Sequence, residues 1–377
     1  MILAVAALVA IGLLSIRLAS NPRNDYFGKQ LVWIAAGMIA FVAINLIHYR
    51  TLGRFAYAFF ILTILMLGLL LVGKFLHMSN QFIDYSHGAY RWFRPFGNYI
   101  PSFDFKIQPS ELAKITFILA LAWYLRHREN YRNLSGLLGP FAVACLPILL
   151  ILPEPDLGTA LLFLPILFAM LFAAGARRRH LLAVIALGLL AAPIMYFFVL
   201  EDYQKGRVTV LLNQESSDPY WLRGEGHQLH LSKLCIGSGG LAGHGFEKSL
   251  FIANRHLPEG HNDFIFALIA HQWGFLGALL LLGLYTVIVL AGLEIAAQQL
   301  DPFGRLVAVG IAALFAAQMF INVGMTMGLM PVTGMNLPFV SYGGTSMLCN
   351  FLALGLLVNV ARHRPYYIGK QPFEFED

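Results

Sequence analysis

Polar residues gather just before one long apolar run, where His261, Asn262 and Asp263 precede FIFALIAHQWGFLG. A carboxylate at such a boundary is partly shielded from water, and this environment suits a general base. Asp263 is therefore a candidate base, and His261 a candidate substrate contact. The alternative is that Asp263 caps the helix that follows. Glu259, His261 and Asp263 also resemble a metal site by residue type, but zinc sites use more His or Cys, so we expect no zinc there.

An acidic and a basic residue lie close together in QPSELAK, residues 108–114. Pro109 and Ser110 are typical of a helix start, with Ser110 as the predicted N-cap. Glu111 then falls in the first turn, where the helix dipole favours a negative charge. Lys114 follows one turn later, and an ionisable residue that deep in a membrane helix is costly unless it is paired or faces a wet cavity. The segment indicates either simple capping or a buried Glu111–Lys114 pair that contacts substrate.

Two more acidic residues, Glu154 and Asp156, stand between apolar runs in LPEPDLGTALLF. Asp directly before an apolar run is typical of an N-cap. Capping of the next helix is thus the simplest role of Asp156.

The region 201–262 carries basic residues and many glycines. Arg207 and Lys233 can offer positive charge to an anionic headgroup, as can His244 and Lys248. The alternative is a basic loop that touches lipid phosphates. GSGGLAGHG in this region is not a nucleotide-binding fingerprint, because no strand precedes it and no Lys-Ser/Thr pair follows.

Prolines and glycines interrupt residues 328–348, GLMPVTGMNLPFVSYGGTSML, so this segment is not a regular helix. Irregular backbone near membrane depth is tolerated where protein or a watery cavity satisfies its polar groups. We therefore expect the segment to line a cavity together with Gln318 and Asn322, and Ser341 is a further candidate contact.

The composition shows what must position these residues. The chain has 377 residues, of which 58% are hydrophobic and 12% charged, and its mean hydropathy is +0.67. Soluble proteins carry about twice that share of charged residues. The apolar runs are continuous, so we predict an all-α integral membrane protein, a single polytopic domain over residues 1–377. The net charge of +6 does not indicate nucleic-acid binding, because most Lys and Arg lie in short loops.

About ten transmembrane helices are predicted from apolar segments of roughly 17–25 residues. They lie near 1–19, 30–48, 54–73, 110–126, 137–152, 158–175, 181–200, 263–293, 305–329 and 345–362. The first run has no basic residues before it and no clear cleavage site, so it is either a true first helix or follows a trimmed terminus.

Basic residues in the short loops fix the expected orientation. HYRTLGR, RHRENYR, GARRRH and RHRPYY all follow even-numbered helices, which places those loops and both termini in the cytoplasm. The connections 74–109, 153–157, 201–262 and 330–344 then lie outside, and 201–262 is a large extracytoplasmic loop between the seventh and eighth helices. Asp263 is thereby expected at the outer face.

Seven segments of the chain together resemble the SEDS family (shape, elongation, division and sporulation). They are GKQLVW, QPSELAK, PDLGTALL, DYQKGRV, GSGGLAGHGF, LPEGHNDFIFA and PVTGMNLPFVSYGGTS. The resemblance leans to the RodA branch, because the FtsW branch usually reads Pro-Thr-Lys-Gly where this chain has PVTG. The chain departs from the family in two respects: Asn262 stands where the family usually has Thr, and His271 and Gln272 stand near the place of a usual acidic pair.

The resemblance implies a peptidoglycan glycosyltransferase that acts on lipid II in the bacterial cytoplasmic membrane, with a class B penicillin-binding protein as partner. The family's essential aspartate falls on Asp263, and its glutamate and lysine fall on Glu111 and Lys114. No cofactor is certain, although Mg²⁺ or Mn²⁺ can assist by offsetting substrate charge. A lipid II flippase is the alternative, but it needs polar residues through the whole core, whereas here they crowd the outer third. A scaffold has no use for three semi-buried ionisable groups.

Overall fold

The computed structural model describes residues 1–19, 25–76, 82–86, 89–95, 106–126, 133–198, 200–214, 224, 226–245 and 260–363. Within these residues a helix stands at each of the ten predicted places. The bounds are α1 Ile2–Ala19, α2 Tyr26–Leu46, α4 Ala56–Phe75, α5 Pro109–Leu125, α6 Leu138–Ile151, α7 Leu157–Ala174, α8 Arg178–Phe198, α13 Ile265–Gln298, α14 Pro302–Met327 and α15 Gly344–Arg362.

Seven of these helices are long and apolar enough to cross a membrane, and two further apolar helices are shorter, Ile2–Arg17 and Ser135–Ile151. The remaining one, α5, has 17 residues and carries Glu111 and Lys114. The chain is therefore a multi-pass, all-α membrane protein, as its composition predicts.

The first residues of three helices confirm one expected N-cap and correct two others. Asp156 does cap α7, since its Oδ1 accepts a hydrogen bond from the Thr159 amide at 3.2 Å. Ser110, however, is not an N-cap: α5 begins at Pro109, one residue earlier, because proline's fixed backbone torsion suits the first helical position. Asp263 is not a cap either, because α13 begins at Ile265 after Phe264.

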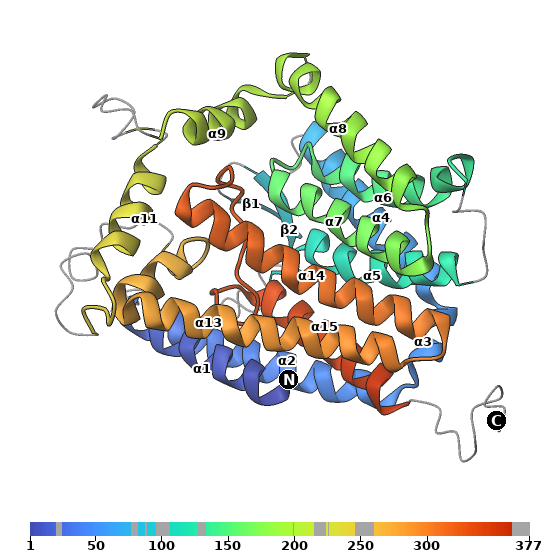
Figure 1. Ribbon diagram of the computed structural model, residues 1–377, viewed down its shortest axis with the longest axis horizontal. Coiled ribbons are helices and arrows are strands. Elements are labelled where there is room, and N and C mark those ends of the chain that lie inside the picture. The colour runs from blue at the N-terminus through green and yellow to red at the C-terminus, as the bar shows by residue number, and fades with distance from the viewer. Residues whose placement is uncertain are drawn as a thin grey trace, which may run out of the picture.

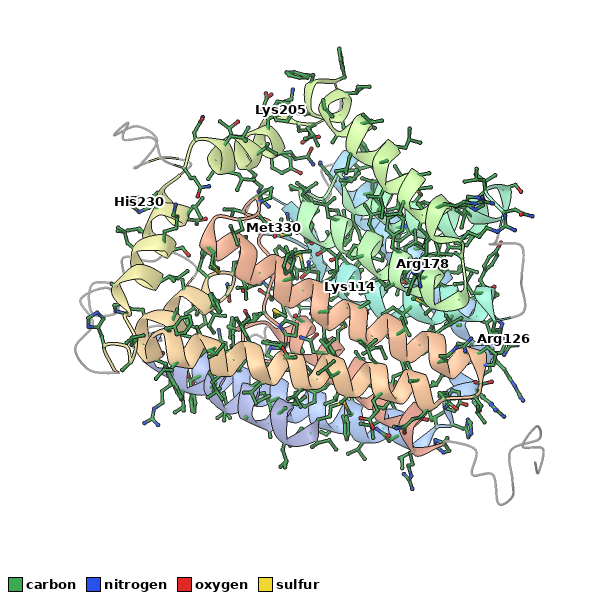
Figure 2. All side chains as sticks on the ribbon, in the orientation of Figure 1. Lys114, Arg126, Arg178, Lys205, His230 and Met330 are labelled. Carbon is green, nitrogen blue, oxygen red and sulfur yellow. The ribbon has the colours of Figure 1, made fainter. Side chains whose placement is uncertain are left out.

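The helices α5, α14 and α15 bury the largest shares of their residues. α14 packs against α13, α7 and α5, while α2 packs against α15. Figure 1 shows α13 and α14 running side by side across the molecule. Small residues let these helices approach closely: a Cβ on Gly310 would lie 2.7 Å from Ile118 Cγ2. Figure 2 shows Lys114 in the middle of the bundle and Arg126 at one of its ends.

A small β-hairpin stands in the connection before α5, and sequence patterns did not predict it. β1 (Ile83–Ser86) pairs antiparallel with β2 (Ala89–Phe93), and Phe93 also bridges to Ile107. Asp84 holds the base of the hairpin through ion pairs with Arg94 at 2.5 Å and Lys106 at 2.7 Å. The hairpin is thereby tied to the residues that lead into α5.

Two short helices occupy part of the region 201–262: α9 (Asp202–Leu212) and α11 (His227–Ser238). The glycine-rich segment after α11 packs against a break in α13 at Gly274, where φ is 67°. Two α13 carbonyls freed by that break, those of His271 and Gln272, accept hydrogen bonds from the amides of His244 and Gly245. The glycines of this segment therefore serve close backbone packing rather than nucleotide binding.

Candidate functional site

A cavity of about 470 Å³ opens among the polar ends of several elements. Its volume lies in the usual range for small-molecule sites. The side chains that line it include Trp33, Arg91, Trp92, Lys106, Gln108, Glu111, Lys114, Asp156, Thr159, Asn262, Asp263, Gln318, Met335, Asn336, Tyr342, Thr345 and Ser346. The irregular segment between α14 and α15 supplies much of this lining, as its prolines and glycines predicted.

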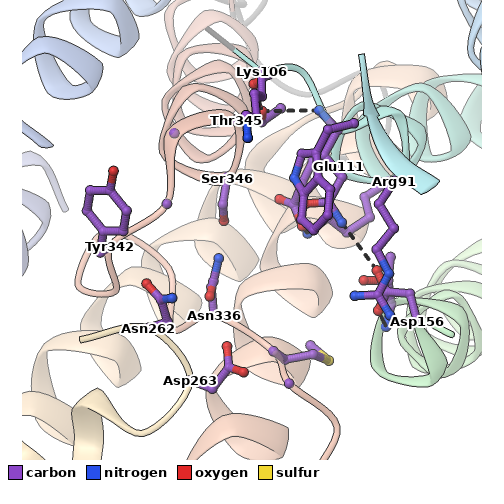
Figure 3. A pocket seen from close by; sticks show the side chains of 18 of the residues that line it. Arg91, Lys106, Glu111, Asp156, Asn262, Asp263, Asn336, Tyr342, Thr345 and Ser346 are labelled. Carbon is purple, nitrogen blue, oxygen red and sulfur yellow. Dashed lines mark hydrogen bonds and ion pairs between the residues drawn. The ribbon is translucent and has the colours of Figure 1, made fainter. Parts of the chain in front are cut away.

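Asp263 projects into the cavity from the turn before α13. Its carboxylate faces the irregular segment, since Oδ2 lies 3.3 Å from the position that a Cβ would take on Gly334. Figure 3 shows Asp263 close to Asn336, with Asn262 nearby. Gly334 has a φ of +71°, so a left-handed backbone without a side chain lets the segment pass close to this carboxylate.

Two buried polar side chains hold the backbone around Asp263. Asn322 on α14 donates to the carbonyls of Asp263 at 2.9 Å and Met335 at 2.5 Å. Ser341 donates to the carbonyl of Asn262 at 2.7 Å and accepts from the Leu337 amide at 2.8 Å. Asn322 and Ser341 were predicted as substrate contacts. The structure gives them a different place, behind the cavity wall, where they fix the chain that carries the carboxylate.

Glu111 and Lys114 form a buried ion pair on α5, with Nζ and Oε1 2.7 Å apart and side-chain exposures of 9% and 3%. Both line the cavity. The second carboxylate oxygen of Glu111 accepts no hydrogen bond from the residues that the structure describes, and the same holds for Gln318 Oε1. These buried acceptors leave hydrogen-bonding capacity for a ligand, because buried polar atoms are normally satisfied.

Arg91 on β2 joins the hairpin to the turn before α7. Its Nε donates to the Glu154 carbonyl at 2.5 Å, and Nη2 donates to the Pro155 carbonyl. Lys74 donates to the neighbouring Pro153 carbonyl at 2.6 Å. Asp156, which follows this turn, also accepts from Gln108 Nε2 at 3.3 Å. The basic hairpin residue is thus held at the cavity wall.

Glu154 lies in the same turn with 2% of its surface exposed. Neither carboxylate oxygen accepts a hydrogen bond within the described part of the chain. Burial, together with the nearby charge of Asp156, raises the pKa of Glu154 to about 9. The side chain is therefore protonated and neutral at physiological pH.

Arg207, on α9, does not line the cavity but lies within electrostatic reach of it. Burial and the like charge of Arg91 lower the pKa of Arg207, while the carboxylates of Asp156 and Asp263 oppose that shift. Its Nη1 is buried and donates to none of the described residues. Arg207 therefore adds positive charge beside the two cavity carboxylates.

Two predicted contacts stand apart from the cavity. Lys233 on α11 is exposed and donates to Gln214 Oε1 at 3.1 Å. His261 stacks on Tyr26, with ring centroids 4.2 Å apart, behind the lining residue Tyr342. Glu259 resembles a metal ligand together with His261 and Asp263 in the sequence, but it lies outside the described residues.

Several lining residues were not singled out from the sequence, above all Arg91, Trp92, Lys106, Asn336 and Thr345. The first three lie in a connection whose hairpin has no strong local signal. Thr345 meets Lys106 across the fold, donating from Oγ1 to its carbonyl at 2.8 Å. One feature of the sequence could have pointed to Arg91 and Trp92: a basic and an aromatic residue stand next to each other in a segment that was expected at the outer face.

Known proteins resemble this chain over almost its full length. A family model described as a cell cycle protein, of FtsW, RodA and SpoVE type, matches residues 1–366. Curated relatives include a probable peptidoglycan glycosyltransferase FtsW of Trichlorobacter lovleyi, which is 33% identical over 96% of this chain and 92% of its own. The peptidoglycan glycosyltransferase MrdB of Escherichia coli K12 is 33% identical over 97% of this chain and 93% of its own.

Solved structures agree with this assignment. The crystal structure of Thermus thermophilus rod shape determining protein RodA is 29% identical, with a TM-score of 0.69 and 97% of each chain covered. A chain of a peptidoglycan synthase complex that coordinates polymerization and crosslinking has a TM-score of 0.78 at 29% identity, over 96% of each chain. The chain belongs to the FtsW/RodA/SpoVE family.

Proposed function

We propose that this chain is a peptidoglycan glycosyltransferase that polymerises lipid II, and that Asp263 is its general base. The observation that carries the proposal is a cavity in which the Asp263 carboxylate lies together with basic and amide side chains. Relatives similar over nearly the whole chain bear the name peptidoglycan glycosyltransferase. The family's FtsW and MrdB branches are both among these relatives, and the PVTG segment supports a role in elongation and cell shape.

The reaction is a displacement at the anomeric carbon of the growing glycan. Asp263 takes the proton of the 4-hydroxyl on the acceptor lipid II, and that oxygen bonds to the anomeric carbon. The bond from this carbon to the pyrophosphate oxygen breaks, and polyprenyl pyrophosphate leaves with both electrons. A single displacement inverts the configuration at the anomeric carbon. No nucleotide is consumed, because the activated bond is already in the lipid.

The leaving group carries negative charge that the protein must offset. Arg91 and Lys114 line the cavity, and Arg207 lies beside its carboxylates. Lys114 is the most enclosed of the three, so its charge is screened least by water. These three side chains are the proposed pyrophosphate contacts. Gln318 and Glu111 face the same cavity and accept hydrogen bonds from sugar hydroxyls.

Mg²⁺ or Mn²⁺ is a further way to offset that charge. Asp156, Asp263 and Glu111 all line the cavity. Among the described residues, however, no three His, Cys, Asp or Glu side chains converge closely enough to share one ion. No step is therefore assigned to a metal, and the assay below is run with and without each cation.

The proposed orientation places the cavity at the outer face of the bacterial cytoplasmic membrane. Asp263 stands at the start of α13, while Asp301, just past its other end, pairs with Arg50 at 3.7 Å. Arg126 lies at that second end too (Figure 2). Clustered Arg favours the cytoplasmic side, which supports an outer position for Asp263.

A class B penicillin-binding protein is the proposed partner, with membrane lipid as the surrounding medium. The similarity to a chain of a complex that coordinates polymerization and crosslinking supports this partner, since crosslinking is the complementary reaction.

Polymerisation of purified lipid II in detergent tests the proposal. Detergent leaves no membrane to cross, so the assay also separates an enzyme from a lipid II flippase. We expect glycan product from the wild-type chain and none above background from Asp263→Ala. Asp202→Asn, which changes an exposed carboxylate on α9 that does not line the cavity, is the matched control and should retain full activity. Polymer formed by Asp263→Ala would refute the assigned base.

A further inference from the structure

The cavity has two chemically different ends. In Figure 3, Tyr342 lies on one side, and Arg91 with Asp156 lies on the other. Asn262 and Asn336 are labelled between them. All of these side chains line the cavity. The Tyr342 end is thus aromatic, and the other end is charged with Trp92 next to Arg91 on β2, while planar amides lie in the middle.

The ring of Tyr342 is held in place by two further rings behind it. Its centroid lies 5.0 Å from that of Tyr26 in an edge-on arrangement and 5.8 Å from that of His261. Tyr26 and His261 stack on each other at 4.2 Å with an interplanar angle of 27°. The Tyr342 amide donates to the His261 carbonyl at 2.9 Å, which fixes the backbone as well. The ring is therefore preorganised rather than free to rotate away.

Trp33 of α2 adds a second aromatic side chain to the lining, from a helix far from Tyr342 in the sequence. Its indole packs directly on Gly344, since a Cβ there would lie only 2.2 Å from Trp33 Cε2. Any side chain at position 344 would displace the indole from this place. The indole of Trp33 thus packs on a glycine that stands two residues after Tyr342, and both aromatic side chains line the cavity.

Aromatic faces combined with amides match the surface of a hexosamine ring. A pyranose has faces of C–H groups, which an electron-rich aromatic face attracts, and a rim of hydroxyls. Asn side chains can both donate to and accept from such hydroxyls and an acetamido group. A pyrophosphate is instead drawn to the basic end. A polyprenyl tail gains nothing from the amides of Asn262 and Asn336.

The geometry of displacement at the anomeric carbon fits a cavity with an aromatic end and a basic end. Attacking and leaving oxygens lie on opposite sides of the anomeric carbon, so the acceptor sugar and the pyrophosphate occupy opposite ends of the site. We propose that Tyr342 and Trp33 form the subsite for the N-acetylglucosamine ring of the acceptor, with Tyr26 and His261 as positioning residues. This subsite rests on the proposed transferase function.

Binding of a soluble GlcNAc–MurNAc disaccharide, without lipid or pyrophosphate, tests the subsite apart from catalysis. The full chain in detergent carries Asp263→Asn so that no turnover occurs, and affinity is measured by NMR saturation transfer. Tyr342→Leu should weaken disaccharide binding about tenfold, the loss of one aromatic contact and its buried area. Tyr342→Phe should bind as the parent does. Tyr196→Leu, on α8, is the matched control for loss of an aromatic ring elsewhere and should also be unchanged.

A short-chain polyprenyl pyrophosphate is the second probe, directed to the basic end. Tyr342→Leu should leave its affinity unchanged. Equal disaccharide affinity in Tyr342→Leu and its parent would overturn the subsite, and so would a loss of both probes, which would mark Tyr342 as a support of the whole cavity. Tyr342-dependent disaccharide binding without any polymer from the wild-type chain would refute the proposed transferase function alone.

Discussion

The buried ion pair on α5 permits a quantitative test, because its two charges can be removed singly or together. Lys114→Met leaves the Glu111 carboxylate, and Glu111→Gln leaves the Lys114 ammonium, in a place where side-chain exposures are only 9% and 3%. The double variant Glu111→Gln/Lys114→Met leaves no charge. The pair distance of 2.7 Å means that each single change removes a close, charge-assisted hydrogen bond.

The double variant should lose less unfolding free energy than either single variant. Removing one partner of a buried pair costs about 3–5 kcal/mol, because the remaining charge is uncompensated. Replacing both by neutral side chains of similar volume is close to neutral. The two single costs therefore should not add, and the coupling in a double-mutant cycle should exceed about 3 kcal/mol.

Thermal unfolding in detergent, followed by intrinsic fluorescence, ranks the four proteins. Both single variants should unfold at lower temperature than wild type, and the double variant should recover most of the difference. None of the three should polymerise lipid II, since Lys114 is lost or its partner is changed. The Arg50–Asp301 pair is the matched control: at 3.7 Å and 59% and 20% exposure, its cycle should give less than about 1 kcal/mol. Additive losses at Glu111 and Lys114 would contradict the description of a coupled buried pair.

Two further substitutions test the support of the site. Asn322→Ala removes donors from the Asp263 and Met335 carbonyls, which should cost roughly 2–6 kcal/mol in unfolding free energy and lower kcat more than it raises KM. Glu154→Gln should unfold like wild type near pH 4.5 and should be the more stable protein at neutral pH, because it removes a pH dependence. Because burial raises its pKa from 4.5 to about 9, the stability that this group contributes is complete below pH 4.5 and lost as pH rises toward 9. Unfolding midpoints between about pH 5 and pH 8 should therefore fall in wild type and stay flatter in Glu154→Gln; parallel curves would contradict the buried acid.

The helices were predictable because a membrane helix is a local feature of sequence. Each long apolar run must satisfy its own backbone hydrogen bonds, so its place can be read without knowing its neighbours. The limits were less exact: α13 extends to Gln298, five residues beyond its predicted end, because the polar residues Glu294 and Gln298 continue the helix past the apolar run until the backbone becomes extended at Gln299. Ser110 shows the same difficulty at a start, where Pro109 takes the first helical position and shifts the cap to Gln108.

Only some of the residues that line the cavity could be predicted, namely those that stand out as polar groups within their own stretch of sequence. Asp263, Glu111, Lys114 and Gln318 are polar groups in or next to apolar runs, and such placement is costly without a purpose. The wall that completes the cavity comes from contacts between distant parts of the chain. Thr345 reaches the Lys106 carbonyl across 239 residues, a contact that no local pattern encodes.

The contrast between Lys233 and Arg91 shows why residue type alone misplaces contacts. Both are basic and lie in expected outer segments, so their charge gives equal reason to assign either to an anionic substrate. Lys233 stands exposed on α11 beside Gln214, whereas Arg91 is held against the turn before α7 by two backbone carbonyls. Those carbonyls fix the guanidinium at the cavity wall before any substrate binds, which lowers the entropic cost of binding there. Contacts with a distant turn hold the Arg91 side chain in place, and the local sequence around Arg91 does not encode them. Arg91 is therefore a stronger candidate than Lys233 to bind the leaving group.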